Sequence, residues 1–297
     1  MEITFLGTGG SYPTRFRNVP AIAVQVKEDL LLLDCGEGTQ RQFMQSNVSF
    51  MKVKKIFITH FHGDHFLGLP GLLQTMAFNN RIDSLEIYGP EGIEKLLDGI
   101  FSLGFWKPSF KIIAKSIVPN DTLQFEGYSV SAELAEHTIP DYAYKIKEED
   151  RRGHFDTEKC KALGIKGKDF SYLESNGFII KNGKKILLKE VTGNSIVGKS
   201  LVYTGDTVPS DRIIKFSNNV DVLIHEASVT KDLENKANEY GHSSSSQAAE
   251  IAVKANAKQL ILTHISPRYE DSTPLLEEAL PIMKNTKLAE DFLVHVF

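Results

Sequence analysis

Short apolar runs separated by glycine and polar residues recur along the chain. Ala21–Val26 and Leu30–Leu33 have the length of a β-strand and are parted by a charged break, so each predicts a strand. Runs of the same kind predict further strands at Glu2–Leu6, Lys55–Ile58, Leu85–Tyr88, Lys111–Ile117, Leu123–Phe125, Val130–Ala135, Ala143–Ile146, Leu201–Tyr203, Val220–Ile224 and Gln259–Leu262.

Other segments carry apolar residues at helical spacing. They predict helices near Thr39–Gln45, at Gly71–Phe78 and at Ser244–Lys254, and Ser243 is the candidate N-cap of the last helix. The mixture of strands and helices indicates an α/β fold.

His, Asp and Glu side chains, which can bind metals or transfer protons, follow several of the predicted strands. Rigid strands position such side chains at the edge of a sheet, where loops give access to a ligand. We therefore expect one shared rim formed by four strand ends, at Thr59-His60, Thr204-Gly205-Asp206, His225-Glu226 and Thr263-His264.

The regular alternation of apolar strands and helices stops between Glu148 and Gly198. This stretch holds a short helical piece at Thr157–Leu163 and the sequence Lys181-Asn182-Gly183-Lys184, in which Asn-Gly between apolar runs predicts a tight hairpin. We interpret residues 150–197, approximately, as an insertion that protrudes as an arm from a single domain spanning residues 1–297.

The insertion is more basic than the rest of the chain. Residues 145–200 contain 13 Lys and Arg against 8 Asp and Glu, whereas the whole chain has a net charge of −4. A basic segment on an acidic body could meet a polyanion, but a solvated surface insertion has the same composition. Charge alone leaves both interpretations open.

The densest chemical signal is the sequence His60-Phe61-His62-Gly63-Asp64-His65. Four side chains able to bind a metal lie within six residues, directly after a predicted strand. Zinc favours imidazole and carboxylate ligands, with a position left for water at catalytic sites. A polar surface loop is the alternative, but such a loop needs no comparable density of ligands.

HxHxDH after an apolar strand resembles the signature of the metallo-β-lactamase superfamily. Further residues occur in that superfamily's order, namely Asp34, His137, Asp206 and His264. The resemblance implies an αββα sandwich with two zinc ions at one edge. It implies one metal on His60, His62 and His137. It implies the second on Asp64, His65 and His264, with Asp206 bridging the two.

The remaining roles in this site differ in how well the residues alone support them. Diiron members of the superfamily tend to carry glutamate at the second histidine, so His62 favours hydrolysis over redox chemistry. These ligands also accept manganese, so the sequence does not select the metal. Asp34 could hold the ligand loop by hydrogen bonds, or it could be a turn residue at a strand end.

Three longer segments resemble the ribonuclease Z family, whose members cut the 3′ trailer from precursor tRNA. They are Phe5–Ser11 with Pro13–Asn18, Asp34–Gln42, and His225–Ser228 followed by Gly241–Ser243. The resemblance implies cleavage of a phosphodiester after the discriminator base, which leaves a 3′-hydroxyl on the tRNA.

The same resemblance suggests catalytic roles. His242 is the candidate general acid, because imidazole can donate a proton near neutral pH, and Glu226 would orient it and raise its pKa. Without the other motifs, His242 would be only a residue flanking a helix. Asp64 could accept a proton from the attacking water while it also binds metal.

Contacts with RNA are expected at two places. Arg15 and Arg17 could bind phosphate, and Phe16 could stack on a base. The insertion lies where family members carry an arm that grips tRNA, and Lys166 and Lys168 keep positive charge there, although Gly164–Phe170 departs from the family's glycine- and proline-rich motif. By resemblance alone we also expect a homodimer in which one subunit's arm serves its neighbour.

Composition narrows these possibilities. The first residues do not form a signal peptide, no apolar run reaches the ~18 residues of a membrane span, and Cys35 and Cys160 cannot form a disulfide framework. We therefore expect a cytoplasmic protein without a membrane partner. Two rivals remain, a metal-dependent phosphodiesterase or sulfatase for a small molecule, and a degenerate member that only binds RNA or protein. The second is disfavoured because all seven ligands are present.

Overall fold

The computed structural model describes residues 1–104 and 106–297. The chain divides into two compact units. The larger, which we call the main unit, consists of Met1–Glu148 and Lys199–Phe297, and the smaller, the inserted unit, is Glu149–Gly198.

The main unit contains two seven-stranded sheets, the first in the order β16-β1-β2-β3-β4-β5-β6. Its strands β3 to β6 run parallel to one another, so their carboxyl ends share one edge. The bounds are β1 Glu2–Gly7, β2 Ala21–Val26, β3 Asp29–Leu33, β4 Val53–Phe57, β5 Leu85–Gly89, β6 Ile112–Ser116 and β16 Val294–Val296.

The second sheet has the order β15-β14-β13-β12-β9-β8-β7. Strands β12 to β15 are parallel, whereas β7, β8, β9 and β12 pair in an antiparallel manner. The bounds are β7 Thr122–Phe125, β8 Tyr128–Ala135, β9 Asp141–Glu148, β12 Ser200–Tyr203, β13 Val222–Glu226, β14 Leu260–Thr263 and β15 Thr286–Leu288.

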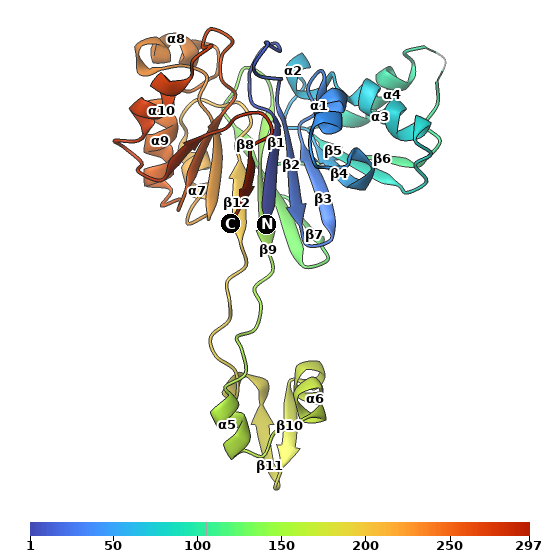
Figure 1. Cartoon of the computed structure of the whole chain (residues 1–297), viewed down its shortest axis with the longest axis vertical. Helices are drawn as coiled ribbons and strands as arrows, with labels where there is room; N and C mark the ends of the chain where they lie inside the picture. Colours follow the sequence, from blue (N-terminus) through green and yellow to red (C-terminus); the bar gives the residue numbers. More distant parts are fainter. Residues whose placement is uncertain (105) are drawn as a thin grey trace. The chain divides into compact units, whose positions relative to one another are not determined.

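Helices cover the outer face of each sheet (Figure 1). Buried residues of α1, α3 and α4 pack on the first sheet, and those of α7, α9 and α10 pack on the second. The helices of the main unit are α1 Thr39–Gln45, α2 Gly63–Phe66, α3 Leu69–Phe78, α4 Ile93–Phe101, α7 Asp211–Phe216, α8 Glu234–Glu239, α9 Ser245–Lys254 and α10 Thr273–Ala279, with 3₁₀ turns η1 Phe50–Lys52 and η3 Lys231–Leu233.

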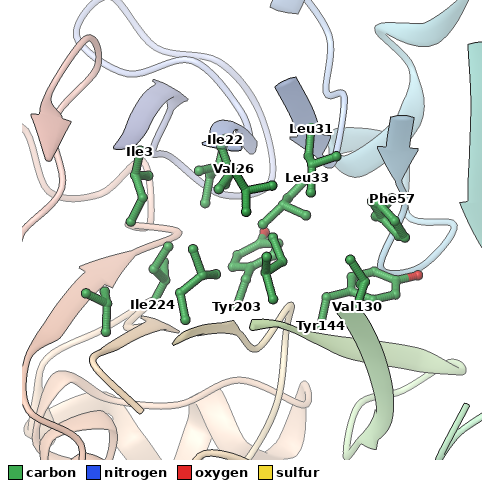
Figure 2. Close-up of a cluster of buried hydrophobic side chains, with 14 of the residues drawn as sticks. Ile3, Ile22, Val26, Leu31, Leu33, Phe57, Val130, Tyr144, Tyr203 and Ile224 are labelled. Carbon is green, nitrogen blue, oxygen red and sulfur yellow. The ribbon is translucent and has the colours of Figure 1, made fainter. Parts of the chain in front are cut away.

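Alternating side chains of the strands build three apolar layers. In β3, Leu31 and Leu33 face the second sheet, whereas Leu30 and Leu32 face the helices. The period of two along a strand produces this division, because successive side chains point to opposite faces. Figure 2 shows residues of both sheets, such as Phe57 and Tyr203, meeting in the central layer. The architecture is the expected αββα sandwich.

The inserted unit connects β9 to β12 and has an apolar cluster of its own, which includes Cys160, Ile165 and Leu173. Its hairpin turns at Asn182 and Gly183, both with positive φ, as the Asn-Gly pair predicts. Its elements are α5 Thr157–Ala162, α6 Lys168–Asn176, β10 Phe178–Lys181, β11 Lys184–Leu187 and the 3₁₀ turn η2 Leu188–Glu190.

One detail differs from the sequence-based expectations. The N-cap of α9 is Ser244, whose hydroxyl accepts a hydrogen bond from the backbone of Gln247, whereas the hydroxyl of Ser243 donates to the carbonyl of Thr207. The prediction of Ser243 as the cap was therefore wrong by one residue. Within residues 1–104 and 106–297, no helix is both long and apolar enough to cross a membrane.

Candidate metal centre

The HxHxDH segment begins at His60, three residues after the end of β4, and its last part forms the short helix α2. Helix α2 turns Asp64 and His65 back toward His60. On this rim Asp34 and His264 have positive φ, 56° and 58°, although neither is glycine. Such conformations cost about 1–3 kcal/mol and persist only where surrounding contacts enforce them. The backbone is thus bent to aim side chains at one place.

Three imidazoles converge on one side of the site. Nδ1 of His62 lies 3.1 Å from Nε2 of His60 and 3.1 Å from Nε2 of His137. Burial lowers the pKa of His60 to about 3, helped by the charge of His65. Burial also lowers the pKa of His62 to about 4. The neutral imidazoles of His60 and His62 can present lone pairs to a shared cation.

A second group stands beside the first. Nε2 of His65 and Nε2 of His264 lie 3.6 Å and 3.5 Å from the same Asp64 oxygen, Oδ2. The carboxylate of Asp206 lies between the groups, 3.7 Å from Nε2 of His60 and 3.4 Å from Nε2 of His65. The structure therefore brings all seven predicted ligands together.

In four of the five histidine ligands, the ring nitrogen that points away from this centre has a partner. Nδ1 of His60 donates to Asp141 at 2.8 Å, and Nδ1 of His65 donates to Asp34 at 2.8 Å. Such partners fix the tautomer and leave the lone pair of Nε2 free for a metal. The same pattern holds for Nδ1 of His137 with the Gly241 carbonyl at 2.8 Å, and for Nδ1 of His264 with the Ser228 hydroxyl at 3.0 Å.

Asp34 is fully buried beneath the ligand loop. Besides His65, its carboxylate accepts hydrogen bonds from the backbone N–H of Thr59 at 2.8 Å and from the Tyr203 hydroxyl at 2.8 Å. It therefore ties β3 to the end of β4 and to the second sheet. These contacts are those of a residue that positions ligands.

Asp141 and Ser228 are contacts of the site that the sequence did not single out. Asp141 begins β9, is fully buried, and also accepts a hydrogen bond from the backbone N–H of Asp206 at 3.0 Å. Its only signal was its position four residues after His137. Ser228 lies within the quoted His225–Ser228 segment, and it bonds both Glu226 and His264.

The donor set fits divalent metal. Among the described residues, buried Nε2 of His65, Nε2 of His264 and Oδ1 of Asp206 have no hydrogen-bond partner. No Lys or Arg among the described residues forms an ion pair with Asp64 or Asp206. Buried carboxylates need a compensating cation, and a metal held by these imidazoles and carboxylates supplies one.

Glu226 and His242 form a pair next to these ligands. Nδ1 of His242 donates to Glu226 at 3.0 Å, and Glu226 also accepts from the Thr207 backbone at 2.9 Å. Burial opposes protonation of His242, but the charge of Glu226 outweighs it and raises the pKa to about 10. The neighbouring His225 turns away and contacts the Glu226 carbonyl. His242 thus presents Nε2 as the ring nitrogen free to exchange a proton.

The glycine-rich loop after β1 lies against the ligands. The backbone N–H of Ser11 donates to Oδ2 of Asp64 at 2.7 Å. A Cβ atom at Gly10 would lie 2.5 Å from the ring of His264, so a side chain does not fit there. Around this centre the structure has a cavity of about 370 Å³, which His62, Asp64 and His242 help to line.

The three residues proposed for RNA contact in this loop face different ways. Phe16 is 64% exposed, and Arg15 is also exposed. The guanidinium of Arg17 points inward and donates to three oxygens at 2.6–2.7 Å, namely Thr8 Oγ1, the Ala289 carbonyl and Ser272 Oγ. We therefore propose that Arg17 shapes the loop, while Arg15 and Phe16 remain proposed contacts.

Asp141→Asn is expected to lower zinc affinity about 10- to 100-fold, because it removes the charged acceptor that fixes the tautomer of His60. A competition titration against a chromophoric chelator measures this. Asp211→Asn changes the same charge at an exposed position of α7 and should leave zinc affinity as in the wild type. Unchanged affinity in Asp141→Asn would contradict the role given to this carboxylate.

Comparison with known proteins places this site in a family. Residues 1–279 match the family model described as anti-Pycsar protein Apyc1. Ribonuclease Z of Picrophilus torridus is 47% identical over 292 residues, which cover 98% of this chain and 94% of the relative. Ribonuclease Z of Pyrococcus horikoshii is 43% identical over 293 residues, 98% of this chain and 94% of the relative.

Solved structures agree. Human tRNase Z, short form, superposes with a TM-score of 0.73 at 30% identity and covers 100% of this chain and 99% of its own. The metallo-β-lactamase fold protein YhfI of Bacillus subtilis reaches 0.72 at 22% identity, covering 99% and 98%, which shows the fold alone. The chain therefore has the metallo-β-lactamase fold and belongs to the family that the matching model describes and to the ribonuclease Z family.

Proposed function

We propose that this protein is an endoribonuclease that removes the 3′ trailer from precursor tRNA. The cut falls after the discriminator base and leaves a 3′-hydroxyl on the tRNA. The relatives named ribonuclease Z, at 40–47% identity over nearly the whole chain, support this assignment. The observation that carries it is the Glu226–His242 pair, 3.0 Å apart, beside a complete set of seven ligands.

Two zinc ions per subunit are proposed, with manganese as an alternative. His60, His62 and His137 would hold one, Asp64, His65 and His264 the other, and Asp206 would bridge them. Ions bound there would lower the pKa of the attacking water and offset negative charge at phosphorus. The proposal rests on the two groups of donor atoms and on the position of Asp206 between them.

The protein's own groups handle the protons. Asp64 accepts a proton from the attacking water, whose oxygen forms the new bond to phosphorus. Nε2 of His242 donates a proton to the 3′ oxygen as its bond to phosphorus breaks, and Glu226 stabilises the charged imidazole beforehand. The products are a 3′-hydroxyl on the tRNA and a 5′-phosphate on the trailer.

Binding of the tRNA body is assigned to the inserted unit. Lys166 and Lys168 are exposed and form no ion pair with a described residue, so both charges are available to phosphates. Arg15 and Phe16 would act nearer the cut. A homodimer in which one subunit's inserted unit serves the neighbouring site is part of the proposal and rests on family resemblance.

Replacing residues 150–197 by a short Gly-Ser linker is expected to lower kcat/KM for precursor tRNA about 100-fold or more, because a second binding contact is lost. Hydrolysis of bis(p-nitrophenyl) phosphate should stay near the wild-type rate, since this compound needs only the metal centre. The two compact units make the deletion feasible. If the protein acts on a small molecule, the wild type will hydrolyse the phosphodiester and leave the precursor uncut.

A further inference from the structure

A second cavity, of about 270 Å³, shares the lining residues Ser11, His242 and His264 with the cavity around the metal centre. Its volume is close to the ~300 Å³ at which ligand sites begin. Val229 and Leu233 give it an apolar side, and Lys236 and Tyr240 come from α8 and the residue after it. We call it the α8 cavity.

The two cavities differ in charge. The cavity around the metal ligands is lined by Glu37, Asp64 and Asp206 and by no Lys or Arg. The α8 cavity is lined by Lys236 and Arg268 and by no carboxylate. Within residues 1–104 and 106–297 neither cation forms an ion pair, and both are exposed. The α8 cavity thus suits a group that carries negative charge.

An aromatic ring stands at the same cavity. Tyr240 is 61% exposed, and its hydroxyl makes no hydrogen bond to any residue that the structure describes. Exposed aromatic rings beside unpaired cations are the combination that proteins use for unpaired nucleotides, where the ring stacks on a base and the cation meets phosphate.

The positions of the catalytic residues indicate which side of the scissile phosphate the α8 cavity serves. In-line displacement places the attacking and leaving oxygens on opposite sides of phosphorus. Asp64, on the side of the attacking water, lines only the first cavity, whereas His242, which protonates the leaving oxygen, lines both. The α8 cavity therefore lies on the leaving-group side.

We infer that the α8 cavity receives the last nucleotide of the mature tRNA, the nucleotide whose 3′ oxygen leaves. Its base stacks on Tyr240, and Lys236 and Arg268 contact the phosphate on its 5′ side. The inference rests on the proposed function. It specifies in addition which side of the cut each cavity binds. The trailer then extends from the first cavity.

A thermodynamic cycle that combines a substitution in the protein with a modification of the substrate tests this assignment. Tyr240→Ala is expected to lower kcat/KM for precursor tRNA about 10-fold, and an abasic residue at the last mature nucleotide should cost a similar factor. Combined, the two changes should cost no more than either alone, because both remove the same stacking contact. Tyr240→Phe keeps the ring and should retain the sensitivity to the abasic residue that Tyr240→Ala loses.

The controls separate this inference from the proposed function. Lys236→Ala should reduce the slope of log kcat/KM against log salt by about 1, whereas Lys254→Ala, on α9 and outside both cavities, should not. Losses that multiply in the cycle, or a Tyr240→Ala effect cancelled by an abasic residue on the trailer side, would overturn the assignment while the cut itself stands. A wild-type protein that leaves the precursor uncut would remove both.

Discussion

Asp206→Asn is expected to lower kcat about 10⁴-fold or more on every substrate, a loss typical of removing a central catalytic group. The carboxylate of Asp206 lies within 3.7 Å of ligand nitrogens in both groups, so the neutral amide weakens both at once. Steady-state rates on precursor tRNA and on bis(p-nitrophenyl) phosphate should fall together, with a lower zinc content by mass spectrometry of the native protein.

Asp98→Asn is the matched control, because Asp98 is exposed on α4, away from the centre. It should keep wild-type rates and zinc content. Near-normal activity in Asp206→Asn with full zinc would show that Asp206 does not link the two groups of ligands.

His242→Ala is expected to lower kcat/KM for precursor tRNA much more than kcat/KM for bis(p-nitrophenyl) phosphate. The loss of a general acid typically costs about 10²–10⁴-fold, and we expect that loss on precursor tRNA, whose 3′ alkoxide is a poor leaving group. p-Nitrophenolate leaves without a proton, so hydrolysis of bis(p-nitrophenyl) phosphate should change far less. The ratio of the two kcat/KM values is the measured quantity.

Glu226→Gln should reproduce this separation in weaker form, since it removes the charge that stabilises protonated His242 but leaves the imidazole in place. Equal losses on both substrates, with zinc content intact, would contradict proton donation by His242. They would indicate instead that His242 supports the ligands that it stacks against, such as His264.

The sequence predicted most of the sandwich because its strands carry their pattern locally. Ala21–Val26 and the helix Thr39–Gln45 have the predicted bounds. The short strands β15 and β16 escaped prediction, since three residues are too few for a pattern and their pairing with β14 and β1 is set by the fold. Helix α6 was not predicted because its sequence, KDFSYLESN, is mostly polar and Leu173 is its single buried residue.

The metal ligands could also be predicted from the sequence. Four of them lie in one six-residue segment, and the others follow strands in a recognisable order. The position of Asp141 was not predicted, because a lone aspartate at the start of a strand has no local signature. It meets His60 only where β9 of the second sheet approaches the end of β4, with the backbone N–H of Tyr142 donating to the Thr59 carbonyl at 3.0 Å. The inward turn of Arg17 depends on residues more than 250 positions away in the chain. The α8 cavity combines loops after β1, β13 and β14 in the same way.

The most direct test is cleavage of a precursor tRNA that lacks an encoded CCA by the zinc-loaded protein, with both product ends mapped at nucleotide resolution. Asp64→Ala is assayed in parallel. We predict a single cut after the discriminator base that leaves a 3′-hydroxyl and is abolished in the variant. An uncut precursor, or cuts at scattered positions, from a protein that still hydrolyses a small phosphodiester would contradict the account.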